Sequence, residues 1–128
     1  MNDPLANALS NLYNAEKIGS KICTIKPASS TIKTVLQLMK DNKYIGDFEI
    51  LKDNKGDLIK VNLIGRINKI GVIKPRFSLK KADFEKFEKR FLPAKDFGLI
   101  IVSTPKGIMT HYHAKEKNLG GVLLSYCY

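Results

Sequence analysis

Long apolar runs and cysteine are both scarce in this sequence of 128 residues. No apolar run approaches the length of about 18 residues that a membrane-spanning helix needs, and no charged-then-apolar signal segment stands at the start. We therefore expect no membrane span and a cytoplasmic location. The two cysteines, Cys23 and Cys127, both lie in apolar, strand-like runs. They are predicted to be small core residues in a reducing compartment, with a disulfide between them as the less favoured alternative.

Motifs for catalysis and nucleotide binding are missing as well. The sequence has no G-x-S-x-G nucleophile turn and no Walker-type G-x-x-x-x-G-K-[ST] motif. In Lys55-Gly56 and Lys106-Gly107 the glycine follows the lysine, as it does in turns. Ser103 near Lys106 suggests a lysine-activated nucleophile, but no carboxylate–histidine pair lies near it in sequence. We therefore predict no catalytic residues, no cofactor and no enzymatic activity.

A metal site is not predicted either. His111 and His113 stand two residues apart, yet zinc requires further ligands and neither cysteine is near them in sequence. The two imidazoles are interpreted as groups that meet phosphate at the start of a helix, or as part of a solvated face.

Positive charge, in contrast, is abundant. The chain has 22 Lys and Arg against 12 Asp and Glu, a formal net charge of +10. Residues 1–64 contain 9 basic and 7 acidic side chains, whereas residues 65–128 contain 13 and 5. An excess of this kind favours partners rich in phosphate, such as RNA or an anionic membrane surface. The binding surface is therefore predicted in the second half of the chain.

The first half has the pattern of a small two-layer αβαββ module. The predicted elements are a helix from Asp3 to Gly19, a strand over residues 21–26 closed by Pro27, a helix from Ser29 or Ser30 to Asn42, and hairpin strands over residues 44–52 and 58–64 around Asp53–Gly56. The apolar residues that recur at helical spacing, and are predicted to face inward, are Leu5, Leu9, Leu12, Tyr13, Ile32, Val35, Leu36 and Met39.

The second half is predicted to be rich in β-structure, with short helices. The expected elements are short β segments over residues 66–76, a helix over residues 82–92, a strand from Leu99 to Ser103, a short helix capped by Thr110 and ending near Asn118, and a closing strand from Val122 to Tyr128. Phe84, Phe87 and Phe91 have helical spacing and are predicted to be core residues rather than a platform for stacked bases. The fold class is thus α+β, with an N-terminal α/β subdomain over residues 1–64 and a basic, β-rich, RNA-binding subdomain over residues 65–128.

The candidate binding loop is Ser103-Thr104-Pro105-Lys106-Gly107, which follows a buried strand. Hydroxyl groups can hydrogen-bond to phosphate and ribose, glycine permits close approach, and proline stiffens the turn. Lys106 and Lys115 are predicted to supply charge for phosphate contacts, with a contribution from the helix start at Thr110. Gly120-Gly121 marks the end of a helix and a turn, or offers bare backbone to an RNA strand, and the two interpretations are compatible.

These residues also carry a resemblance. The segment GLIIVSTPKGIMTHYHAK, residues 98–115, resembles the signature of the small-subunit ribosomal protein eight family, the S-eight family. The opening DPLANALSNLYNA and the closing GGVLLSYCY resemble the first helix and last strand of its members, so the likeness extends over the whole chain. The segments YIGDFEI and GRINKIGVIKPRF resemble the archaeal and eukaryotic branch.

The resemblance implies a two-domain protein that binds an irregular helix in the central domain of small-subunit (16S-type) rRNA and helps to assemble the platform. It implies RNA contacts from residues 103–107 and from Gly120-Gly121, and neighbouring small-subunit proteins and its own mRNA as further partners. Regular A-form RNA hides its deep groove, so recognition through shape and the minor groove agrees with this implication. Bacterial relatives have polar residues where this chain has Pro105 and Val122. The alternative is a basic protein-interaction or assembly module without specific RNA recognition.

Overall fold

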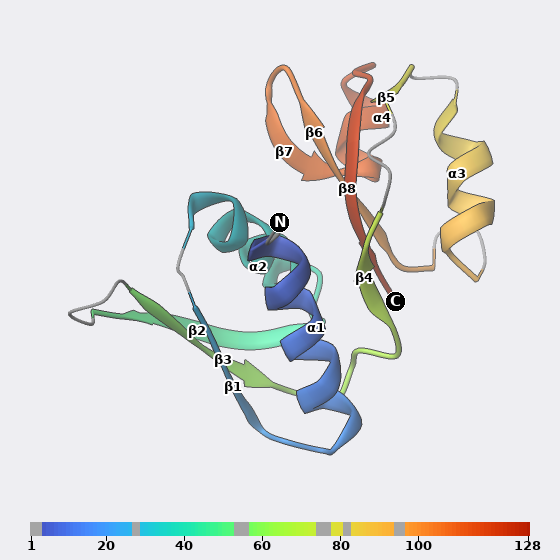
Figure 1. Cartoon of the computed structure of the whole chain (residues 1–128). Coiled ribbons are helices and arrows are strands. Elements are labelled where there is room, and N and C mark those ends of the chain that lie inside the picture. Colours follow the sequence, from blue (N-terminus) through green and yellow to red (C-terminus); the bar gives the residue numbers. More distant parts are fainter. Residues whose placement is uncertain (1–3, 27–28, 53–56, 74–77, 81–82, 94–96) are drawn as a thin grey trace. The chain divides into compact units, whose positions relative to one another are not determined.

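The computed structural model describes residues 4–26, 29–52, 57–73, 78–80, 83–93 and 97–128. The chain forms two compact units, Met1–Ile70 and Gly71–Tyr128, called unit 1 and unit 2 below (Figure 1). The division falls six residues after the domain boundary predicted from sequence, and each unit is described by itself. Helices and antiparallel sheets occur together, which confirms the predicted α+β class.

Unit 1 has the predicted αβαββ order. Its elements are α1 (Pro4–Lys17), β1 (Ile22–Ile25), α2 (Ser30–Asp41), β2 (Ile45–Leu51) and β3 (Leu58–Leu63). The three strands form one antiparallel sheet in the order β1-β3-β2. Both helices bury the apolar stripe that the periodicity predicts, except that Tyr13 is only half-buried. The ammonium group of Lys17 lies over the Tyr13 ring, 5.5 Å from the ring centroid.

The ends of the second helix follow its sequence signals. The Ser29 hydroxyl accepts a hydrogen bond from the Ile32 N–H at 3.2 Å, and Asn42 is the C-terminal cap. Such a cap satisfies one of the backbone donors that a helix start leaves unpaired. The predicted cap Asp3, the strand-closing Pro27 and the hairpin turn Asp53–Gly56 lie outside the described residues.

The elements of unit 2 are β4 (Ile70–Val72), whose first residue is the last residue of unit 1, β5 (Ser78–Leu79), α3 (Phe84–Phe91), β6 (Leu99–Thr104), β7 (Gly107–Thr110), α4 (His111–Glu116) and β8 (Gly121–Cys127). Its sheet has the order β4-β8-β6-β7, and β5 also pairs with β8. Phe84 is fully buried, and Phe87 and Phe91 pack against the same apolar cluster. The core role predicted for the three phenylalanines is confirmed.

Strand β7 was not predicted from sequence patterns, and neither was the two-residue β5, which lies beyond the predicted β segments of residues 66–76. Strand β7 has only four residues, and its last residue, Thr110, is also the N-cap of the next helix. The segment is therefore too short to show an alternating pattern or a long apolar run. It exists because it pairs with β6 in antiparallel register, with Val102 opposite Met109. Pairing with a neighbouring strand, rather than local propensity, therefore decides this segment.

Two further sequence expectations concern the cysteines and membrane-spanning segments. Cys23 and Cys127 are both buried, which confirms their core role, and no disulfide joins them; burial also raises the pKa of the Cys23 thiol. Among the described residues, no helix is long and apolar enough to cross a membrane.

Candidate nucleic-acid interface

The candidate loop is the turn of a β-hairpin formed by β6 and β7. Thr104 lies opposite Gly107, and the exposed Pro105 and Lys106 occupy the turn between them. Pro105 suits the first of these positions because its ring restricts φ to about −65°. Gly107 has φ +123°, yet a Cβ there would meet nothing within 4 Å. Backbone conformation, and not crowding, therefore favours glycine, and its surface is open to a ligand.

The Thr104 hydroxyl is engaged inside this turn. Its Oγ1 donates to the Gly107 carbonyl at 2.8 Å and accepts from the Lys106 N–H at 3.2 Å. A hydroxyl has one proton to donate, and the Gly107 carbonyl takes it here. Thr104 is also 8% exposed, whereas Ser103 is half-buried on β6. In this conformation Thr104 holds the shape of the turn.

Gly121 allows β8 to approach β6. A Cβ at Gly121 would lie 2.3 Å from the Ser103 carbonyl oxygen and 2.9 Å from Val102 Cγ1, closer than any side chain can come. The first residue of β8 must therefore be glycine for the strand to lie where it does. Packing accounts for Gly121, and the exposure of backbone to RNA at Gly120-Gly121 stays a prediction.

Strand pairing adds a residue that sequence reasoning missed. Ser103 of β6 lies opposite Val122 of β8, and Val122 lies opposite Ser78 of β5. Ser78 is exposed, and β5 lies at the same end of the sheet as the β6–β7 turn (Figure 1). The basic composition around it, Lys74 to Lys81, was the only sequence signal. Ser78 comes close to Ser103 only through the order of the strands, because both residues lie opposite Val122.

Helix α4 begins as predicted, with the Thr110 hydroxyl accepting from the His113 N–H at 3.4 Å. The interpretation of both histidines as surface groups is wrong for His111, which is fully buried; only His113 is exposed. The Nδ1 atom of His111 accepts the Ile100 N–H at 3.0 Å, which satisfies this buried nitrogen and ties the helix to β6. A buried side chain of this kind cannot serve as a phosphate contact.

Lys115 also differs from its predicted setting. Its ammonium group pairs with the carboxylate of Glu88 on α3, and the Glu88 side chain is 2% exposed. The positive charge of Lys115 is thus largely compensated within the protein. Lys106 at the hairpin turn is exposed, so the two predicted phosphate contacts are electrostatically unlike.

Comparison with known families now adds to this geometry. The family model for ribosomal protein S8 matches residues 3–128, nearly the whole chain. The chain belongs to the ribosomal protein S8 family.

Membership in the S8 family makes the chain a small-subunit ribosomal protein, RNA-binding and engaged in translation on the ribosome. The family implies rRNA and other ribosomal proteins of the small subunit as partners. It is a family of structural ribosomal proteins and not of enzymes. Among the described residues, no group of three or more His, Cys, Asp or Glu side chains could hold a metal ion.

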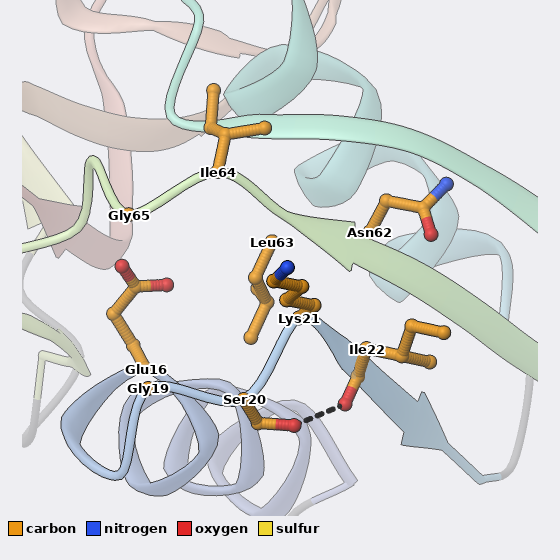
Figure 2. A pocket seen from close by; sticks show the side chains of 9 residues that line it. All are labelled: Glu16, Gly19, Ser20, Lys21, Ile22, Asn62, Leu63, Ile64 and Gly65. Atoms are coloured by element: carbon orange, nitrogen blue, oxygen red, sulfur yellow. Dashed lines mark hydrogen bonds between the residues drawn. The ribbon is translucent and has the colours of Figure 1, made fainter.

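This S8 protein also has a pocket. Figure 2 shows it in unit 1, where the end of α1 meets β1 and the end of β3. The Ser20 hydroxyl at its edge donates to the Ile22 carbonyl at 2.9 Å. The residues that line it are Glu16, Gly19, Ser20, Lys21, Ile22, Asn62, Leu63, Ile64 and Gly65. None of the residues predicted to bind RNA is among them, because those all belong to unit 2.

Proposed function

We propose that this member of the S8 family binds small-subunit rRNA directly through one end of the unit 2 sheet, called the loop end below. The loop end comprises residues 103–107, residues 120–122 and Ser78. The observation that carries the proposal is the register that sets Ser103, Val122 and Ser78 side by side next to the β6–β7 turn. Three strands thus bring hydroxyl groups, close-packed backbone and an exposed lysine to one edge.

In this proposal the residues of the turn have different roles in RNA binding. Ser103 donates or accepts hydrogen bonds to ribose or base edges, and Lys106 contacts phosphate as an exposed charge. Thr104 and Pro105 keep the turn in its bound shape, which lowers the entropy lost on binding. Gly107 offers backbone that a side chain does not cover. Lys115 contributes less to phosphate contacts than its position suggests, because Glu88 compensates it.

The target we propose is an irregular helix in the central domain of the small-subunit rRNA. A small rigid hairpin cannot enter the deep groove of regular A-form RNA, but a distorted helix with unpaired bases exposes edges and a widened minor groove. Binding at that helix would make the protein a primary binder that helps to assemble the platform. This finer assignment rests on the family resemblance together with the geometry of the loop end.

Footprinting tests the proposal. The purified protein is added to total small-subunit rRNA at moderate salt, and nucleotide protection is mapped along the whole molecule. One compact protected helix in the central domain is expected. Diffuse protection, or protection that disappears when unspecific RNA is added, would instead support the alternative of a basic protein-interaction module.

Repression of its own synthesis is the second part of the proposal, because a similar irregular helix in its mRNA would fit the same surface. We expect the mRNA leader to compete with the rRNA helix for the protein. If the leader binds no better than RNA of shuffled sequence, the proposal of repression is wrong while rRNA binding is unaffected.

A further inference from the structure

Three polar side chains meet in the interior of unit 2, between α3 and α4. Glu88 comes from α3, and His111 and Lys115 come from α4. The Glu88 and His111 side chains are 2% and 0% exposed, and the Lys115 side chain is 32% exposed. A carboxylate so far from water is costly unless a cation compensates it. The ammonium group of Lys115 does so through its contact with Glu88 Oε1.

His111 connects this cluster to the sheet. Its Nδ1 accepts the Ile100 N–H, so the neutral ring carries its proton on Nε2. That nitrogen faces Glu88 Oε1 at 3.6 Å. The neighbouring Tyr112 hydroxyl donates to the Gly98 carbonyl at 2.9 Å, just before β6. The first turn of α4 is therefore attached both to α3 and to the start of β6.

The other end of α4 leads to the loop end. The Leu119 N–H donates to the Ala114 carbonyl at 2.9 Å, and Ala114 is fully buried. After Leu119 the chain passes through Gly120 to Gly121, the first residue of β8. Gly121 has no free space next to the Ser103 carbonyl. A shift of α4 must therefore be transmitted to the start of β8 and to Ser103, because this contact cannot be compressed.

We propose that Glu88 is a positioning residue for the RNA-binding surface: its buried carboxylate holds Lys115 and thereby fixes α4, and with α4 the start of β8, against the β6–β7 hairpin. The proposal rests on the proposed function of the loop end. Glu88 touches no RNA in this role. It acts by keeping Gly121 and Ser103 in register, and it withholds the charge of Lys115 from phosphate.

The variant Glu88→Gln tests the proposal, and Glu116→Gln is its matched control. Each removes one negative charge from the same unit, but Glu116 is exposed at the end of α4. Binding is measured to the rRNA fragment that the native protein protects, and to poly(U) as unspecific RNA. For Glu88→Gln we expect the preference for the fragment to fall about tenfold, and for Glu116→Gln to stay within about twofold. Equal preferences in the two variants would overturn the proposal.

Amide hydrogen exchange separates this proposal from the proposed function. In the protein without RNA, Glu88→Gln is expected to increase exchange at Val122 and at other β8 amides paired with β6, whereas Glu116→Gln leaves them unchanged. If the native protein protects no rRNA fragment, the proposed function fails, and exchange alone then decides the role of Glu88. Unchanged exchange in Glu88→Gln would overturn that role.

A double variant covers the case in which the single one does not fold. In Glu88→Gln/Lys115→Gln the ion pair becomes a pair of neutral amides, and the net charge is that of the native protein. The slope of log affinity for poly(U) against log salt concentration is expected to equal the native slope, because Glu88 already compensates Lys115. A slope smaller by about 0.7 would mean that Lys115 binds phosphate in the native complex, and would contradict the proposal.

Discussion

The β6–β7 turn and the pair of helices α3 and α4 in unit 2 each contain a lysine that was predicted from sequence to contact phosphate. The two lysines differ in their exposure and in whether a carboxylate compensates their charge. Lys106 lies exposed at the turn, whereas Lys115 is paired with the buried carboxylate of Glu88. An exposed charge releases counterions from RNA when it binds; a compensated one releases fewer. The charge count of unit 2 therefore overstates the charge that RNA can use.

The largest effect expected from this difference concerns stability. Lys115→Met leaves Glu88 buried without its cation, and we expect the free energy of unfolding to fall by about 3–5 kcal/mol. Lys106→Met removes the same charge from an exposed turn and should change stability by less than about 0.5 kcal/mol. Urea unfolding followed by circular dichroism measures both. Similar midpoints for the two variants would abolish the distinction between the regions.

The contact where the two regions meet can be tested at Gly121. Gly121→Ala forces β8 away from the Ser103 backbone, and we expect a loss of about 1–3 kcal/mol in stability. Gly107→Ala adds the same methyl group in open space, and it should cost only the strain of its left-handed backbone, about 1–2 kcal/mol.

Amide exchange distinguishes these two substitutions more sharply than stability does. Gly121→Ala should increase exchange where β6 pairs with β8, and Gly107→Ala should not. If both variants perturb the same amides, then Gly121 does not transmit the position of α4 to the hairpin.

Substitutions of the two hydroxyl residues at the turn, Ser103 and Thr104, should differ in their effects on RNA binding and on stability. We expect Ser103→Ala to weaken binding to the cognate rRNA helix by about 1–3 kcal/mol, with little effect on unspecific RNA or on stability. Thr104→Ala removes a hydroxyl that makes two hydrogen bonds in the turn, so it should also lower the free energy of unfolding by about 1 kcal/mol. Binding assays on both RNAs and urea unfolding measure these effects. Equal losses on both RNAs would contradict a recognition role for Ser103.

The smallest effect concerns salt. Lys106→Met should reduce the slope of log affinity against log salt concentration by about one, the loss of a single phosphate contact. Titrations of the protected rRNA fragment at several salt concentrations measure the slope. A slope equal to that of the native protein would show that Lys106, too, makes no phosphate contact.

Local sequence signals determined most of the secondary structure and the family. Helical spacing predicted the buried faces of α1, α2 and α3, and the caps at Ser29 and Thr110 were both visible as residue types. These features are predictable because they depend on residues within a few positions of one another. The segments that resemble the S-eight family likewise identified the ribosomal protein before any fold was known.

The tertiary structure alone decided which of the basic and polar residues are free to act. Glu88 lies 27 positions before Lys115, and Ser78 lies 44 positions before Val122, so no local pattern joins either pair. His111 offered no sign that its ring would be buried against the Ile100 N–H. Such contacts form because sheet order and helix packing bring distant segments together, and only then do burial and pairing determine whether a charge faces RNA or the core.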